Sequence, residues 1–365
     1  IPEWWIANRL APSGEIGERL NDDGDMLQQW ASYPFVEDAP IGETIRDMGR
    51  KLADIAIKMY LSDDYLNIFR HTPHHSYEEG FNCIASNAWW NYGDPVHYER
   101  AMRLSDSISK LMVDAGCGHR HFRSTYIEAL DLYTSPPPET AGSTLPILLH
   151  PAYEVAWYNR NPAAIEFYSQ WADAWTEHQE PGHYATSIDV KTGKVVGAHK
   201  TQVGRGGYRT QGIAWLGIYE LTKDPRFLKP FIMAVDAGHT AIRVHYGANY
   251  ANASHFLEYL RKKNRVDLLP TYAYYVATGK TDRLEAGLEA AVAEWQRFGH
   301  MYTAAEPYTD RVFTLPFIEV FNCYLGSYAA RNIFPHNFAV SYEGLGKDFA
   351  ALVGPSDEKS LKVTF

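Results

Sequence analysis

Apolar and small residues recur along much of the chain at three- and four-residue steps, the spacing that places them on one face of an α-helix. After Asp94-Pro95 the spacing is kept by Tyr98, Ala101, Met102, Ser105 and Ile108. Asp at the N-cap and Pro at the first helical position favour a helix start there. Gly93 is typical of the end of the helix expected over 84–92. The pattern predicts a helical hairpin with a very short corner.

The same unit recurs along the sequence. Similar corners fall at Asn161-Pro162, Asp224-Pro225 and Thr281-Asp282, so that successive corners, counted from Pro95, are 67, 63 and 56 residues apart. The regions 41–60 and 312–332 also read as helices. A regular period of helix, corner and helix predicts hairpins that bury their apolar faces against one another. We expect an all-α fold of about five to six hairpins closed into an (α/α) toroid, with an open solenoid as the alternative.

The helical pattern is not interrupted by a linker, which indicates a single main domain. The 365 residues contain no Gly/Ser- or Pro-rich linker, so we expect a toroid over 41–335, with the acidic segment 1–40 as part of it. The stretch 178–212 reads as an elaborate loop. The final residues, "SLKVTF", alternate like a strand, so 336–365 is expected to be an extension that begins a β-domain. The chain starts at Ile1, which indicates a removed leader or a piece of a longer protein.

The connections predict where the chemistry gathers. The hairpin corners are short, whereas the returning connections are long, so we expect all the long ones on one face. They cover 67–82, 114–124, 133–149, 178–212, 243–256 and 299–311. These segments are rich in His, Arg, Asn and Tyr, which makes their face the expected site.

The charge and the aromatic content of the chain limit the class of ligand that it is expected to bind. The chain has 34 Lys+Arg against 44 Asp+Glu, which argues against binding nucleic acid. The sequence contains no run of 18 consecutive apolar residues, the length that a membrane-spanning helix requires, so we expect no membrane insertion. The segments 116–124 and 198–212 are basic and free of acids, which favours an anionic ligand unless their arginines pair with acids elsewhere. Aromatic residues make up 14% of the chain, and Trp4, Trp5, Tyr184 and Tyr250 lie outside the clear helices, where they could stack on sugar rings.

The repeated helix–corner–helix units over about 40–335 resemble the (α/α) toroid carbohydrate-active enzymes, which include polysaccharide lyases and six-hairpin glycosidases. Several such lyases place an Asn and a His on one loop and an Arg and a Tyr some fifty residues later. "NYANASH" (249–255) and "YTDR" (308–311) are similar in content and separation, but they depart from the tight Asn-Asn-His form. The resemblance implies a secreted or periplasmic lyase that acts on an anionic polysaccharide.

Such a lyase removes the proton α to a uronate carboxylate and expels the 4-linked oxygen by β-elimination. A Tyr or His serves as base, and Arg, Asn or His neutralises the carboxylate. The expected catalytic residues are Tyr208, Arg209, His255 and Tyr308. The expected substrate-binding residues are Asn252, Arg311, Arg205, His150, His74 and Asn249. An Arg beside a Tyr favours the phenolate.

The acidic segment 14–30 supports a rival hypothesis. It holds Glu15, Glu18, Asp22, Asp23 and Asp25, which fit helix capping and substrate contacts, a calcium site, or the carboxylates of an inverting or retaining glycoside hydrolase. No Glu stands where an EF-hand loop needs one. The histidines of "HTPHH" (71–75) and "CGHRH" (117–121) lack the usual zinc spacings. We therefore expect no required cofactor and no metal, with calcium near Asp22, Asp23 and Asp25, or zinc at one of these histidine runs, as the minority alternatives. A non-catalytic helical-repeat binding protein is the third class.

Overall fold

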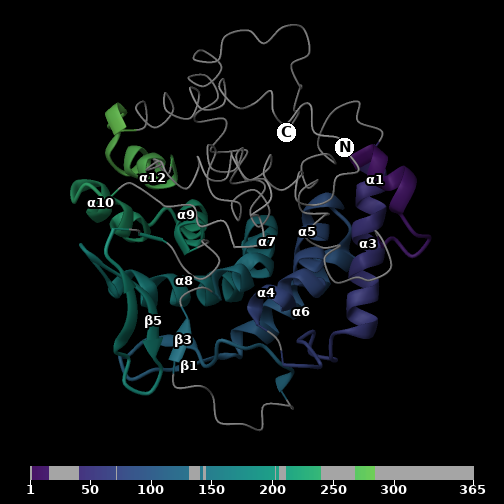
Figure 1. Ribbon diagram of the computed structural model, residues 1–365, viewed down its shortest axis with the longest axis horizontal. Helices are drawn as coiled ribbons and strands as arrows, with labels where there is room; N and C mark the ends of the chain where they lie inside the picture. Colours follow the sequence, from purple (N-terminus) through teal and green to yellow (C-terminus); the bar gives the residue numbers. More distant parts are fainter. Residues whose placement is uncertain are drawn as a thin grey trace, which may run out of the picture.

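The computed structural model describes residues 2–15, 41–70, 72–130, 140–142, 145–201, 203–204, 211–239 and 268–283. These parts of the chain are mostly helical, and two small antiparallel sheets, one of four strands and one of two, lie to one side of the helices (Figure 1). The chain enters through α1 (Pro2–Arg9), and the long helix α3 (Ile41–Met59) precedes the hairpins.

Three helical hairpins follow one another in the described chain. They are α5 (Asn82–Trp90) with α6 (Pro95–Ser109), α7 (His150–Asn159) with α8 (Pro162–Glu177), and α9 (Gln211–Thr222) with the 3₁₀ turn η5 (Pro225–Leu228) and α10 (Lys229–Asp236). Their corners fall where the sequence predicts them. The repeated hairpin is therefore confirmed as the unit of this part of the fold.

Each of these corners is built from the same three-residue device. The cap side chain accepts a hydrogen bond from the backbone N–H two residues later, at 3.0 Å for Asp94, 2.9 Å for Asn161 and 3.0 Å for Asp224. The residue before each cap has left-handed backbone, with φ of 91° at Gly93, 57° at Arg160 and 58° at Lys223. A proline follows each cap, where its missing N–H leaves no bond unmade. The reversal is therefore set by neighbouring residues.

The fourth predicted corner is described only in part. Helix α12 (Leu268–Thr278) ends before Gly279, which has φ of 71°, and helical backbone resumes at Asp282. The remainder of that hairpin and the predicted helix over 312–332 lie outside the described residues.

The first two corners lie at the same end of the helix layer. Trp89, near the end of α5, packs edge-on against Trp157, near the end of α7, with ring centroids 4.5 Å apart. Tyr98, at the start of α6, stacks on Tyr158 at 3.6 Å. Helices α5 and α7 therefore run side by side in the same direction, as successive hairpins of a repeat do.

The third corner lies elsewhere. Arg226, two residues after Asp224, forms an ion pair of 3.1 Å with Asp173, which lies in the C-terminal half of α8. Since a helix rises about 1.5 Å per residue, that contact is about 18 Å along α8 from the Asn161 corner. The expectation that all corners share one end holds for the first two and not for the third. Closure into a toroid stays a prediction, because 284–365 lies outside the described residues.

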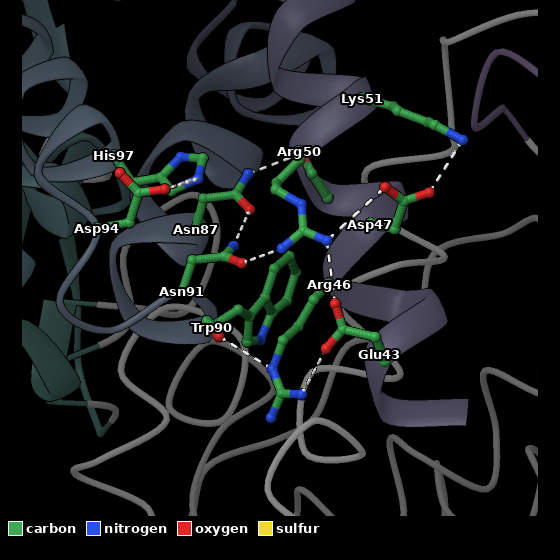
Figure 2. Close-up of polar contacts among 11 residues, drawn as sticks. Glu43, Arg46, Asp47, Arg50, Lys51, Asn87, Trp90, Asn91, Asp94 and His97 are labelled. Atoms are coloured by element: carbon green, nitrogen blue, oxygen red, sulfur yellow. Dashed lines mark hydrogen bonds and ion pairs between the residues drawn. The ribbon is translucent and has the colours of Figure 1, made fainter. Parts of the chain in front are cut away.

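Helix α3 is fixed to α5 by close packing and by a polar network (Figure 2). The Asn87 side chain donates to the Gly49 carbonyl at 2.7 Å, and Arg50 donates to the Asn91 side chain at 2.6 Å. Gly49 lets the helices approach, because a Cβ there would lie 2.7 Å from the Trp90 ring. Side-chain amides of α5 thereby satisfy backbone and side-chain groups of α3, and the pair forms one rigid unit.

The two sheets are the main departure from the all-α prediction. Strand β5 (His183–Asp189) pairs antiparallel with β3 (Thr140–Gly142), β4 (Gln179–Glu180) and β6 (Val195–His199), and β1 (Met112–Asp114) pairs with β2 (Arg120–Phe122). The expected loop 178–212 is thus largely strand up to His199. Its strands are short, and a bulge between Ala185 and Ile188 breaks their alternation. Their pairing with β3 supplies the stability that the local pattern does not indicate.

The predicted division of the chain at residues 40 and 335 stays a prediction. Most of 1–40 and all of 336–365, with its expected β-domain, lie outside the described residues. In the described parts, no helix is both long and apolar enough to cross a membrane.

Candidate functional site

Most residues singled out from the sequence fall outside the described structure. This holds for Tyr208, Arg209, His255, Tyr308, Asn252, Arg311, Arg205 and Asn249, and also for Asp22, Asp23 and Asp25. His74 lies within the short helix α4 (Pro73–Ser76). His150 is the predicted site residue whose side chain the structure describes, and it lies at the centre of a buried group of ionisable side chains.

His150 begins α7, directly after the 3₁₀ turn η4 (Leu145–Leu149), and Pro151 occupies the first turn of the helix. Glu154 lies one helical turn later on the same face, because residues four apart are neighbours on a helix surface. The Nε2 atom of His150 is 3.2 Å from Oε1 of Glu154. Both side chains are buried, with 0% and 1% exposure. The sequence "HPAYE" thus creates a buried imidazole–carboxyl pair from one helix.

Tyr77 completes a chain of three groups. It lies in the π-helix η2 (Tyr77–Phe81), which leads into α5, and its hydroxyl is 2.8 Å from Nδ1 of His150. π-Helical turns are uncommon and occur frequently at functional sites. When the Nε2–H of His150 donates to Glu154, Nδ1 is left as an acceptor for the Tyr77 hydroxyl. Glu154 therefore fixes the orientation of the imidazole, with Nδ1 toward the phenol.

A second contact extends the group to α9. The Tyr153 hydroxyl donates to Oε2 of Glu220 at 3.2 Å. Gly217 lies one turn before Glu220, and a Cβ there would lie 3.1 Å from the Tyr153 ring, so α9 comes close to α7 at this point. We refer to Tyr77, His150, Tyr153, Glu154 and Glu220 as the α7 polar cluster.

Burial governs the ionisation of the α7 polar cluster. It raises the pKa of Glu154 well above its usual range and lowers the pKa of His150 to about 3. It also raises the pKa of Glu220 to about 7, against the opposing effects of the Tyr153 hydrogen bond and the charge of Lys223. In each case desolvation disfavours the charged form. Carboxyl groups that hold protons near neutrality are suited to acid–base chemistry.

The arrangement can move protons along a defined line. The Tyr77 hydroxyl and Nδ1 of His150 form a hydrogen bond of 2.8 Å, and Glu154 contacts the imidazole from its other side. A phenol activated by a neighbouring imidazole acts as a base, and in its protonated form it acts as an acid. The cluster lies at the end of α7 remote from the Asn161 corner, which is the end that the sequence predicts for the site.

The sequence predicted His150 as a substrate-binding residue and did not predict the residues that it contacts. The His150–Glu154 spacing of four was a usable signal, because it places both groups on one helix face. Tyr77 and Glu220 carried no such signal, since their contacts span 73 and 67 residues. Tyr184, expected to stack on a sugar, is instead 1% exposed and bonds its hydroxyl to Nδ1 of His239 at 2.9 Å.

Other expected site segments have structural roles in the described chain. Arg120, from the basic segment 116–124, donates to the Gln170 side chain at 3.0 Å and to the Met112 carbonyl at 2.8 Å. It therefore holds β2 against α8, and the alternative in which such arginines have structural partners applies to it. Glu15, from the acidic segment, accepts a hydrogen bond from Ser13 at 2.7 Å within a turn.

Comparisons with known proteins give no family for this chain: it matches no protein-family model, and no curated protein matches it in sequence. The geometry of the α7 polar cluster and the sequence patterns therefore carry the functional argument.

Proposed function

We propose that the protein is a polysaccharide lyase that cleaves a uronic-acid-containing polysaccharide by β-elimination. The observation that carries the proposal is the 2.8 Å contact between the Tyr77 hydroxyl and Nδ1 of His150, inside a scaffold of helical hairpins. β-Elimination needs one group that removes a proton α to a carboxylate and one that protonates the leaving oxygen. A tyrosine coupled to an imidazole can do both in turn.

The proposed step moves one proton from carbon to oxygen. Tyr77, oriented by its hydrogen bond to Nδ1 of His150, acts in its phenolate form and takes the proton α to the uronate carboxylate. The C–O bond to the 4-linked sugar breaks as the double bond forms, and Tyr77 then gives that proton to the leaving oxygen. Glu154 contacts Nε2 of His150 and so holds the imidazole with Nδ1 toward Tyr77.

The carboxylate of the substrate also needs a cationic or hydrogen-bonding partner. Arg209, His255, Asn252 and Arg311 are the residues that the sequence proposes for this role, and they lie outside the described structure. Tyr208 and Tyr308 stay alternative bases for the same reason. Replacing each tyrosine by phenylalanine in one assay ranks them against Tyr77, because only a hydroxyl is removed.

The reaction class is tested by its product. We expect incubation with a panel of uronate polysaccharides to produce the ultraviolet absorbance of an unsaturated uronate with at least one of them, with no cofactor added. New reducing ends without that absorbance would mean hydrolysis and would overturn the lyase proposal.

The role of Tyr77 is tested with a matched pair of variants. Tyr77→Phe should lower turnover at least about a hundredfold, the usual scale of a lost acid or base. Tyr98→Phe is the control, because Tyr98 is also buried but its hydroxyl has no hydrogen-bond partner in the described structure. Thermal stability is measured for both proteins. An active but less stable Tyr77→Phe would show that the Tyr77 hydroxyl is structural.

Glycoside hydrolysis is the second candidate, and one observation favours it. Glu220 has its pKa raised to about 7, which suits a general acid at neutral pH. In that case the product carries no double bond, Glu220→Gln removes turnover, and Tyr77→Phe retains it. The same two assays therefore separate the candidates.

A further inference from the structure

A second group of chemically active side chains shares no residue with the α7 polar cluster. Cys117 is in the turn that joins β1 to β2, His121 is on β2, and His178 is the residue that ends α8. One potential ligand atom from each, the sulfur of Cys117 and a ring nitrogen of each histidine, lies within 4.8 Å of the others. The three residues meet where the β1–β2 hairpin touches the end of α8.

Three ring nitrogens of this group have no hydrogen-bond partner among the described residues. His121 is 1% exposed, and neither its Nδ1 nor its Nε2 forms a hydrogen bond in the described structure. Nε2 of His178 is also buried there without a hydrogen bond. Buried polar atoms nearly always have a partner, and leaving one unsatisfied costs stability. Three such atoms on two facing rings, 5.4 Å apart, point to a missing electron-pair acceptor between them.

The surroundings hold the group in place. The ring of His121 packs edge-on against Trp175 of α8 with centroids 4.9 Å apart. Gly193, in the turn between β5 and β6, lies so close to Cys117 that a Cβ there would collide with its backbone. The Gly116 N–H donates to the Val190 carbonyl at 3.2 Å. The Cys117 turn is thus fixed from one side by the sheet, and His121 is fixed from the other by α8.

The ligand types select the metal. A thiolate with two imidazoles suits Zn²⁺, which favours sulfur and nitrogen ligands in a tetrahedron. With bonds of about 2.0–2.3 Å, such ligand atoms are about 3.3–3.8 Å apart, so small side-chain rotations close the present spacing. His119 lies beside the group, with its ring centroid 6.1 Å from that of His178, and is a candidate for a fourth position.

We propose that Cys117, His121 and His178 bind a structural zinc ion, with His119 or water as the fourth ligand. The ion links the β1–β2 hairpin to the end of α8, immediately before β4 begins at Gln179. It thereby joins the sheet to the helical hairpins. The site is separate from the proposed lyase chemistry and does not depend on it.

Metal content is the first test. Protein purified without chelators should contain about one zinc ion per chain by elemental analysis, and the zinc-depleted protein should rebind one. Substitution with Co²⁺ should give a thiolate-to-cobalt charge-transfer band and the visible bands of a tetrahedral ion. Cys117→Ser and His178→Ala should weaken zinc binding at least about tenfold, with loss of the charge-transfer band in Cys117→Ser. Cys83→Ala is the control, because Cys83 is buried in α5, and its zinc content should stay unchanged.

A second measurement keeps the proposal testable if the variants do not fold. In the unmodified protein, zinc should slow the reaction of Cys117 with a thiol reagent, and a chelator should restore it, with the labelled residue identified by peptide mapping. Zinc should also raise the melting temperature. His119→Ala distinguishes the fourth ligand: weaker binding assigns His119, and unchanged binding assigns water. The proposal is overturned if the depleted protein binds no zinc, or if Cys117→Ser binds it as tightly as the unmodified chain.

Discussion

At the scale of single residues, what matters is how tightly each side chain is enclosed. Tyr77 and Tyr98 are both buried tyrosines, yet the hydroxyl of the first is hydrogen-bonded to His150 and the hydroxyl of the second has no described partner. Gly49 shows the same dependence on surroundings, since its missing side chain is what lets α3 approach Trp90. Residue type alone distinguishes none of these cases.

Gly49→Ala should destabilise the protein although alanine favours helix by about 1 kcal/mol. The added Cβ would lie 2.7 Å from the Trp90 ring and 3.2 Å from the Asn87 side chain, so α3 and α5 must separate. We expect a net loss of about 1–3 kcal/mol in urea unfolding, the usual cost of overpacking.

The matched control is Lys58→Ala, at an exposed position of α3, which should change stability by less than about 0.5 kcal/mol. Trp90→Phe combined with Gly49→Ala should recover part of the loss, because the smaller ring leaves room for the Cβ. A Gly49→Ala protein as stable as the original would show that the two helices are not packed this closely.

At the scale of elements, the hairpin corner is the repeating device. A left-handed residue ends one helix, an Asp or Asn caps the next, and Pro occupies the following position. Each part acts over a few residues, which is why the corners can be located from sequence. The residues of a corner do not determine which helix packs beside it. The Asp224 corner, for example, lies beside the C-terminal half of α8.

Asn161→Ala should lower stability by about 1 kcal/mol, because the side chain accepts hydrogen bonds from the Ala163 and Ala164 N–H groups at the start of α8. Asn161→Asp keeps the acceptor and adds a charge that favours the positive end of the helix, so it should be neutral or slightly stabilising. Thermal unfolding of the two variants gives the comparison. Equal losses in both would mean that the cap does not set the corner.

At the scale of the whole molecule, burial of apolar side chains holds the hairpins together, and burial of ionisable side chains shifts their pKa values. Trp171, Trp175 and Trp215 are fully buried: Trp171 of α8 contacts Trp215 of α9, and Trp175 of α8 contacts His121 of β2. The folded state therefore carries carboxyl groups whose protons are held more tightly than in the unfolded chain. Its stability must depend on pH accordingly.

Glu220 provides a measurable case. Its pKa is raised from 4.5 to about 7 on folding, so the folded state binds the proton more tightly. The corresponding stability is fully present below pH 4.5 and is lost as the pH rises through 7, by up to about 3 kcal/mol. Glu220→Gln lacks this loss.

The free energies of unfolding of the two proteins should therefore diverge in favour of Glu220→Gln between pH 4.5 and pH 8, measured by urea titration at several values. Tyr153 and Lys223 face Glu220 in both proteins, so their contributions largely cancel in the difference. A difference that stays constant with pH would show that the Glu220 carboxyl titrates normally.

The sequence by itself determined the hairpins and their corners, because helical periodicity, caps, left-handed residues and prolines act between neighbours in the chain. It also placed His150 among the residues expected at the site. The spacing of four residues in "HPAYE" brings His150 next to Glu154. The structure alone decided which helix ends meet, how 178–199 pairs as strands, and which residues face His150. Tyr77 joins it across 73 residues, and His178 joins Cys117 and His121 from the far end of α8. Such contacts depend on the packing of whole elements, whose energy is spread over many side chains and leaves no local pattern.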